Sequence, residues 1–332
     1  MTSDSGELHP FEKLTPEFIL NAVEAEGLWC DGRIFPLNSY ENRVYQVGVE
    51  DASPLIAKFY RPGRWDYAQI KEEHDYTYEL ESHELPVVTP LRREDGESVR
   101  SFEGFYFSLY PRKGGHAPEL DQMDNLFILG RLMGRIHAVS ATSSFQHRPT
   151  IDVRSYGEEC VEFVSAHFIP DSLKSAYGSL TRDLLAILRE RLDEEYLQSC
   201  IRTHGDCHIG NMLWRDDYVH FVDFDDARMA PAIQDIWMLL SGERHLQVQQ
   251  LSEIVEGYEE FYEFPLRQLK WIEPLRTLRM LHYCAWLARR WEDPAFPRNF
   301  PWFNTERYWG EHILELREQL SLLKEPPLAL PI

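Results

Sequence analysis

One segment near the middle of the chain carries the pattern that most constrains how this protein folds. The segment opens with the motif H-x-D-x4-N over residues 204–211 and continues to an apolar run that leads into Asp223. Between them, Met212–Trp214 and Tyr218–Val222 flank a polar triplet, which predicts a β-hairpin. A hairpin returns the chain to where it began, so Asn211 and Asp223 are expected at the same end of one strand pair.

Asp206, Asn211 and Asp223 supply the groups that phosphoryl transfer needs. The motif has the spacing of a kinase catalytic loop, in which one carboxylate accepts the proton of the substrate hydroxyl. An amide oxygen and a second carboxylate hold Mg²⁺ on the phosphates of the nucleotide. We therefore predict Asp206 as the catalytic base, and Asn211 and Asp223 as ligands of Mg²⁺.

A zinc site is the alternative interpretation of the same segment. Two cysteines and two histidines lie close enough in sequence to act as sulfur and nitrogen ligands: Cys200, His204, Cys207 and His208. Zinc would leave the nearby carboxylates and the amide without a role, Asp225 among them. Such hard oxygen donors favour Mg²⁺.

The neighbours of these residues have structural or open assignments. His204 is expected to pack inward and order the loop, whereas His208 either belongs to the loop structure or contacts phosphate. Asp235 is expected to be structural, either accepting hydrogen bonds from the backbone of residues 204–211 or capping a helix.

Hydrophobic periodicity divides the chain into two lobes and predicts an α+β fold. Residues 1–110 are expected to form a small β-rich lobe with one main helix, Ala68–Leu80, and residues 111–332 a larger helical lobe. The expected strands of the first lobe are Arg33–Leu37, Arg43–Val49, Leu55–Tyr60, Pro86–Leu91 and Gly104–Tyr110. The expected helices of the second are one around Leu126–Ile136, then Leu180–Gln198, Gln234–Leu240, His245–Tyr262, Leu266–Trp291 and Thr305–Leu323.

The first lobe also contains candidate nucleotide contacts. Lys58 lies in an otherwise apolar strand, where it is poorly placed unless it reaches a phosphate or a carboxylate. Glu73 could pair with it and direct it toward the α- and β-phosphates; Glu72 is the neighbouring candidate, but helix phase favours Glu73. The turn at residues 38–42 lacks a G-x-G-x-x-G motif, yet Ser39 and adjacent backbone N–H groups could cap a phosphate.

Composition narrows the partners and the cellular location. A formal net charge of −21 repels nucleic acid, and no Lys/Arg-rich run offsets it. The apolar stretch Phe127–Val139 is interrupted by Arg131 and Arg135, so no membrane span is expected. Met1–Pro10 has no features of a secretory signal, and the five cysteines are scattered, which favours reduced thiols in the cytoplasm.

The region from Trp271 to Trp302 is rich in Trp, Tyr and Arg. An aromatic stripe at helical spacing is usually part of a core. The alternative is a wall of the acceptor site that faces the cleft between the lobes.

Five stretches resemble the aminoglycoside phosphotransferase/choline kinase superfamily of eukaryotic-like kinases: Pro36–Gln46, Lys58–Pro62, His204–Asn211, Val222–Ala227 and Trp291–Trp302. Within it, nearly the whole chain is similar to bacterial stress-response serine/threonine kinases. The resemblance implies a bilobal protein-kinase-like fold and a monomeric cytoplasmic enzyme that uses ATP and Mg²⁺ to phosphorylate proteins and itself. It also implies that Asp206 is the proton acceptor, that Asn211 and Asp223 bind magnesium, that Asp223 is an active-site residue, and that Ser39 contacts the nucleotide.

Three functions are compatible with these residues. A serine/threonine protein kinase and a small-molecule hydroxyl phosphotransferase would use the same groups, so the motifs do not separate them. The acidic composition favours a cationic small molecule, and the whole-chain resemblance favours protein substrates. A nucleotide-binding regulator without catalysis is disfavoured because the lysine, the asparagine and the carboxylates are all present.

Overall fold

The structure is a computed structural model that describes residues 9–216 and 218–330. Most of the segment assessed above for a secretory signal, residues 1–8, lies outside the described residues. Asp217, in the turn of the expected hairpin, does so as well.

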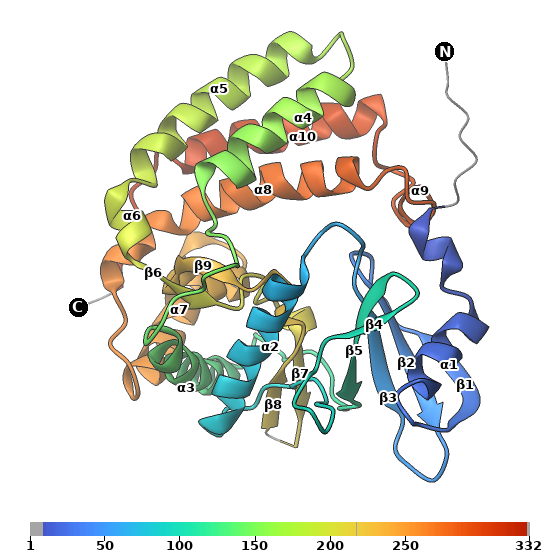
Figure 1. Cartoon of the computed structure of the whole chain (residues 1–332). Coiled ribbons are helices and arrows are strands. Elements are labelled where there is room, and N and C mark those ends of the chain that lie inside the picture. The colour runs from blue at the N-terminus through green and yellow to red at the C-terminus, as the bar shows by residue number, and fades with distance from the viewer. Residues whose placement is uncertain (1–8, 217, 331–332) are drawn as a thin grey trace.

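A five-stranded antiparallel sheet forms the first lobe (Figure 1). A short helix, α1 (Pro16–Glu24), packs on it through an aromatic core that includes Phe18, Phe59 and Phe105. The strands follow the order β1-β2-β3-β5-β4, with bounds β1 (Cys30–Pro36), β2 (Arg43–Val49), β3 (Leu55–Phe59), β4 (Arg100–Phe102) and β5 (Phe105–Pro111).

Helix α2 (Tyr67–Ser82) is the main helix of this lobe, as predicted. It starts at a capping box, in which the Asp66 carboxylate accepts from the Gln69 N–H and the Gln69 side chain accepts from the Asp66 N–H. One of its faces is buried and carries Glu73, Tyr76 and Leu80. The helix therefore presents a carboxylate to the interior of the molecule.

The prediction of a strand at Pro86–Leu91 is wrong. The sheet still has five strands, because β4, which was not predicted, takes its place. The Val88 N–H donates to the Phe221 carbonyl (3.1 Å) and the Leu91 N–H to the Leu109 carbonyl (2.7 Å), so this run bonds to two different elements in turn. Its two prolines lack the N–H groups that a continuous ladder needs. The segment thus links the sheet to the second lobe.

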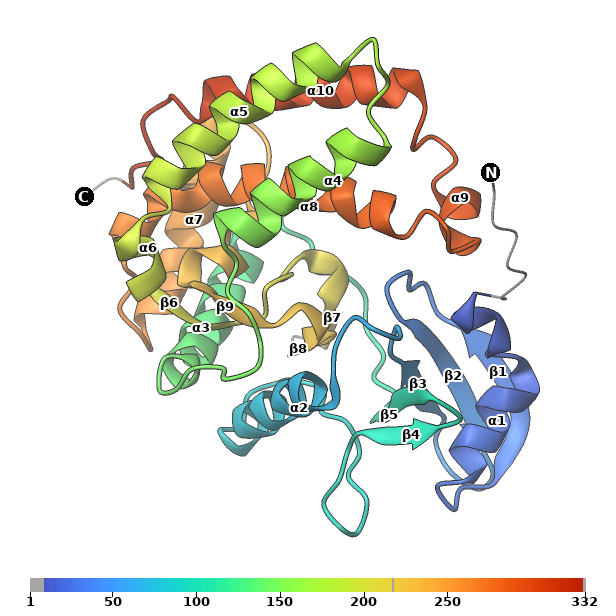
Figure 2. The same cartoon turned by 45° about the horizontal axis from the view of Figure 1, so that its top comes forward.

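The second lobe is mostly helical (Figure 2). Helices α3 (Met123–Ser140) and α7 (Arg244–Glu259) approach so closely that a Cβ on Gly130 would lie 2.1 Å from the Ile254 carbonyl oxygen. The other helices are α4 (Glu159–His167), α5 (Lys174–Arg191), α6 (Glu194–Gln198), α8 (Ile272–Arg289), α9 (Ala295–Asn299) and α10 (Glu306–Leu322).

Three helix predictions need correction. The expected helix at residues 180–198 is two helices, because Asp193 caps the N-terminus of α6. Residues 232–239 form short 3₁₀ turns rather than an α-helix. Residues 266–271 are also 3₁₀, and α8 begins only at Ile272, with Pro274 in its first turn, where the missing N–H costs nothing.

Two short strand pairs belong to the second lobe, and β6 and β9 lie among its helices (Figure 1). Strand β6 (Cys200–Thr203) pairs with β9 (Arg228–Pro231), and β7 (Met212–Arg215) pairs with β8 (Tyr218–Phe221). In the second pair Met212 lies opposite Phe221, which confirms the predicted hairpin. Asn211 and Asp223 therefore flank the same end of the β7–β8 hairpin.

Within the described part of the chain, no helix is both long enough and apolar enough to cross a membrane. All five cysteines are free thiols.

Candidate active site

The backbone of the predicted catalytic loop (residues 204–211, below called the catalytic loop) is held by one buried carboxylate. Asp235 accepts hydrogen bonds from the N–H groups of His204 (2.8 Å) and Gly205 (2.9 Å), and its Oδ2 lies 3.2 Å from His137 Nε2. This confirms the first of the two structural roles considered for Asp235. Gly205 has φ +83°, and a Cβ there would come within 2.1 Å of the Asp226 carbonyl oxygen, so only glycine fits.

His204 packs inward, as expected. Its Nε2 lies 2.9 Å from the Val222 carbonyl oxygen, and its ring contacts that of Phe224 with 4.5 Å between centroids. The ring thereby joins the catalytic loop to the segment that follows β8. His208 also serves the loop, because its Nδ1 accepts from the Gly210 N–H (2.9 Å).

The zinc interpretation finds no support in this geometry. One ring nitrogen of His204 contacts the Val222 carbonyl, and one of His208 accepts from the Gly210 N–H. The Cys200 thiol donates to the Tyr196 carbonyl. In residues 9–216 and 218–330, no group of three or more His, Cys, Asp or Glu side chains is arranged to hold a metal ion.

Asp206 is held between two basic side chains. Arg279 of α8 donates to its Oδ1, and His208 Nε2 lies 3.5 Å from its Oδ2. Burial raises the pKa of Asp206, but the hydrogen bond from His208 and the charge of Arg279 outweigh it, so the pKa lies well below its ordinary value. The carboxylate is thus ionised at neutral pH and aligned from both sides.

Asn211 and Asp223 are suited to binding a hard cation. The Asn211 side chain donates through Nδ2 to the Asp206 carbonyl (2.9 Å), and its Oδ1 accepts no hydrogen bond from the described residues. Asp223 is 54% exposed and has φ +60°, a left-handed conformation that Asp tolerates better than most residues. One amide oxygen and one carboxylate are a donor set that fits Mg²⁺, with phosphate oxygens completing it.

Lys58 does not form the expected ion pair with Glu73. Its Nζ lies 2.8 Å from Asp223 Oδ1 and 3.2 Å from Asp225 Oδ1. Burial opposes its charge, but these two carboxylates keep the pKa of Lys58 well above its ordinary value. Glu73 is instead paired with Arg148 (2.7 Å), while Glu72 faces away and accepts from the backbone N–H groups of residues 146–148.

Arg148 forms the ion pair with Glu73 that was expected of Lys58. No motif in the sequence indicates this role. Besides Glu73, its guanidinium donates to the carbonyls of Gln69 (2.9 Å), Asp225 (2.6 Å) and Ala227 (3.3 Å). One side chain thus ties α2 to residues 223–227. Arg148 lies in an irregular stretch before a proline, where no periodicity or motif marks it.

Asp225 is a buried member of the same charge network. It contacts Lys58 and accepts from Arg64, whose other terminal nitrogen lies 2.6 Å from Asp226 Oδ1. Burial raises the pKa of Asp225, but Arg64 and Lys58 outweigh it and lower the pKa to about 2. These contacts assign Asp225 to the ion-pair network that fixes residues 223–227.

Two cavities adjoin at these residues. The first, of about 330 Å³, has apolar walls from both lobes, including Val44, Ile56, Leu213 and Phe224, with Lys58 at one side. The second, of about 470 Å³, is lined by the catalytic loop and by α8, and residues common to both cavities include Ser39, Asn211 and Asp223. Ser39 Oγ accepts from the Val44 N–H (3.1 Å) and so also stabilises its own turn.

The aromatic region from Trp271 to Trp302 contributes both to the core and to the wall of a cavity. Trp271 is fully buried in the core. Tyr283 and Trp286 line the second cavity and stack on each other with 5.7 Å between ring centroids.

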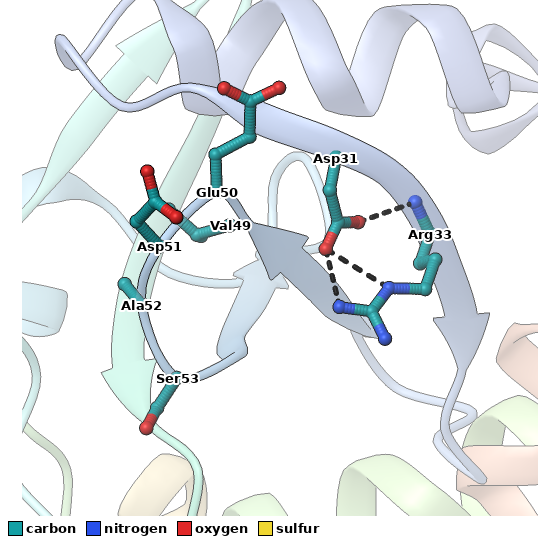
Figure 3. A pocket seen from close by; sticks show the side chains of 7 residues that line it. All are labelled: Asp31, Arg33, Val49, Glu50, Asp51, Ala52 and Ser53. Carbon is teal, nitrogen blue, oxygen red and sulfur yellow. Dashed lines mark hydrogen bonds and ion pairs between the residues drawn. The ribbon is translucent and has the colours of Figure 1, made fainter.

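A further hollow lies on the sheet lobe away from these cavities (Figure 3). It is lined by Asp31, Arg33 and residues 49–53, and Asp31 accepts from the backbone N–H (2.9 Å) and Nε (3.0 Å) of Arg33. It shares no residue with the two adjoining cavities, and its one basic side chain, Arg33, is already paired with Asp31.

A sheet lobe joined to a helical lobe, with a carboxylate-rich loop and a buried lysine between them, defines a kinase-like phosphotransferase. The chain belongs to the phosphotransferase enzyme family, whose profile matches residues 34–272. It is 45% identical over 321 residues to stress response kinase A of Escherichia coli (strain K12), and 44% identical to the serine/threonine protein kinase RdoA of Salmonella typhimurium (strain LT2). Each of these alignments covers 96% of this chain and 97% of the relative.

Solved structures share the fold. Amicoumacin kinase hAmiN, solved with AMP-PNP, Ca²⁺ and Ami, superposes with a TM-score of 0.73 at 19% identity, covering 97% of this chain and 98% of that one. Choline kinase from Cryptosporidium parvum gives a TM-score of 0.60 at 12% identity, covering 93% and 96%. The predicted α+β fold, with a small sheet lobe and a helical remainder, is confirmed.

Proposed function

We propose that this chain is an ATP- and Mg²⁺-dependent serine/threonine protein kinase that also phosphorylates itself. It acts as a monomer in the cytoplasm, in a bacterial stress response. The observation that carries the proposal is the meeting of Asp206, Asn211 and Asp223 where the two cavities join, with Lys58 beside them. The names of the relatives support a protein acceptor and a role in stress.

Each cavity has a distinct task in this proposal. Residues 1–110 supply most of the nucleotide cavity, whose apolar walls suit the flat adenine ring and whose Lys58 and Ser39 suit the phosphates. Residues 111–332 supply most of the acceptor cavity, where Asp206 faces the incoming hydroxyl. Glu73 acts indirectly, because it holds Arg148 and adds negative charge near Lys58.

The reaction joins the acceptor oxygen to the γ-phosphorus and breaks the bond between that phosphorus and the bridging oxygen of ADP. The hydroxyl proton passes to the carboxylate of Asp206. Because this carboxylate has a depressed pKa, it is a weak base that aligns the hydroxyl and takes its proton late in the transfer. Arg279 and His208 keep it ionised and oriented.

Asn211 and Asp223 would hold Mg²⁺, which when bound neutralises charge on the phosphate oxygens. Lys58 contacts the same carboxylate of Asp223, so it places a second positive charge at the boundary between the cavities.

A small-molecule hydroxyl phosphotransferase is the second candidate. The observation that favours it is the acceptor cavity itself, whose volume of about 470 Å³ and stacked Tyr283–Trp286 wall suit a compact ligand. Both candidates use the same groups for chemistry and differ only in what enters this cavity.

The test is incubation of the purified chain with labelled ATP and Mg²⁺, followed by phosphosite mapping. We expect labelled Ser or Thr residues in the chain and in added protein. Turnover on a small hydroxyl compound without any protein labelling would establish the second candidate instead.

Asp206→Ala tests the assignment of the base. We expect the rate of transfer to fall by a factor on the order of 100 to 10,000, with the affinity for an ATP analogue largely retained. Asp183→Ala, which removes an exposed carboxylate on α5, is the matched control and should leave the rate unchanged. Full turnover by the Asp206 variant would show that another group is the base.

A further inference from the structure

The turn between β1 and β2 is held in place by hydrogen bonds and ion pairs that involve residues 286–293, in the C-terminal part of the chain. We call residues 38–42 the phosphate turn, since Asn38 to Asn42 line the acceptor cavity and Ser39 lines both cavities. Figure 2 shows α9 above the sheet lobe that contains β1 and β2. This contact joins segments some 250 residues apart in sequence.

Asp293, between α8 and α9, is the centre of this contact. Its side chain is only 3% exposed and accepts two hydrogen bonds from Arg43 (3.0 and 2.8 Å) and one from Arg61 (2.8 Å). Its position is fixed by the Ala295 N–H, which donates to the same carboxylate (3.1 Å). A buried carboxylate with two guanidinium partners is strongly held. Its removal takes the ion pair from Arg43 and leaves Arg61 with Glu41 (3.1 Å).

The two arginines pass this constraint to the backbone of the phosphate turn. The Tyr40 carbonyl accepts from both Arg43 (2.9 Å) and Arg61 (3.0 Å), and the Glu41 carbonyl accepts from Arg61 (2.9 Å). The Arg61 N–H in turn donates to the Asn42 side chain (3.0 Å). The shape of the turn is therefore set by arginines that Asp293 holds, and not by glycines.

Side chains of the phosphate turn strengthen the same contact. Glu41 accepts from the indole N–H of Trp286 (2.5 Å) and lies 2.6 Å from Arg290, both at the end of α8. The Tyr40 ring packs edge-on against Phe300 with 4.9 Å between centroids. Two consecutive residues of the turn are thus anchored on the helical lobe.

We infer that Asp293 is a positioning residue that, through Arg43 and Arg61, fixes the phosphate turn against the phosphates of the nucleotide. The inference rests on the proposed function, because it requires that the turn contact phosphate. It explains how a turn without a glycine-rich motif can be preorganised: the helical lobe supplies the rigidity that the turn itself lacks.

The test compares ligands with and without phosphates. For Asp293→Asn, we expect the KM for ATP and the Kd of a non-hydrolysable ATP analogue to rise about tenfold or more, with kcat changed much less. The Kd of adenosine should stay unchanged, because adenosine does not reach the turn. Glu292→Gln, at the exposed neighbouring acid, is the matched control, and Asp293→Glu should restore part of the affinity.

The outcomes separate this inference from the alternatives. Equal losses of affinity for the ATP analogue and for adenosine would show that Asp293 only stabilises the fold. Unchanged affinities would show that the turn keeps its shape without Asp293. Either result overturns this inference and leaves the proposed function standing. A wild-type chain that does not bind the analogue overturns the proposed function and the inference together. Arg43→Gln, which removes the charge from the other side of the contact, gives the same comparison if Asp293→Asn does not fold.

Discussion

At the scale of single residues, the site is organised by arginines that neutralise carboxylates. Asp206, Asp225 and Asp293 each accept from one or two guanidinium groups, and all three have lowered pKa values although burial opposes this. A formally acidic chain thus keeps its functional carboxylates ionised without leaving them unpaired. The lining of the acceptor cavity nevertheless stays acidic, with Glu41, Asp206, Asp223, Asp225 and Asp226 against Arg64 and Arg279.

Arg279→Ala should change how Asp206 titrates. Without the guanidinium, the pKa of Asp206 rises toward its ordinary value, so the acidic limb of the pH profile of kcat/KM should move to higher pH. A shift of about one unit corresponds to ~1.4 kcal/mol. Arg289→Ala, an exposed arginine near the end of the same helix, should leave the profile unchanged. If the acidic limb stayed in place, Arg279 would have no influence on the pKa of Asp206.

At the scale of elements, α2 and the segment after β8 behave as one unit because Arg148 bonds to both. Glu73, at the centre of this contact, has a raised pKa because burial outweighs the charges of Lys58 and Arg148. The contact therefore depends on the buried Glu73–Arg148 ion pair, in which each side chain compensates the charge of the other.

Arg148→Met should lower the free energy of unfolding by about 3–5 kcal/mol, because it leaves the Glu73 carboxylate buried without its partner. Adding Glu73→Gln should recover much of this loss, which urea denaturation would detect as non-additivity of the two changes. The control is Arg154→Ala, which breaks an exposed pair with Glu159 and should cost less than about 1 kcal/mol. Strict additivity would mean that the two buried groups do not stabilise each other.

The same contacts explain what the sequence could and could not predict. A local pattern identifies the β7–β8 hairpin, because its two strands are neighbours in the chain. The inward packing of His204 follows from its place in the motif, although its partner Val222 lies 18 residues further on. The partner of Lys58 could not be found in this way, since the choice between Glu73 and Asp223 depends on where Arg148 lies. The apolar run at residues 86–91 misled for a similar reason: it bonds to two elements rather than to one strand.

At the scale of the whole molecule, the lobes are joined by buried polar side chains as well as by the chain itself. Each lobe also encloses a histidine in its own core: His74 in the sheet lobe bonds to Tyr60 (2.8 Å), and His312 in the helical lobe packs on Tyr308. Burial lowers the pKa of His74 to about 3 and that of His312 to about 4. Both are neutral in the folded protein at pH 5, whereas they are charged in the unfolded chain.

We therefore expect the stability to fall as the pH is lowered from 7 to 5. Since the unfolded chain binds more protons in this range, each histidine should cost on the order of 2 kcal/mol at pH 5. Glu73, with its raised pKa, acts in the opposite sense and reduces the effect. Urea denaturation at several pH values measures the slope, and His74→Gln should flatten it by about one proton; a stability independent of pH would contradict the expectation.

The hydrogen bonds of Arg148 to α2 and to the segment after β8 also affect how far α2 can move. In many kinases the helix that corresponds to α2 swings outward to switch the site off. Here that swing would strip one buried guanidinium of its hydrogen bonds to the segment after β8. An outward movement of α2 would therefore break buried hydrogen bonds, so the fold opposes this way of opening the site.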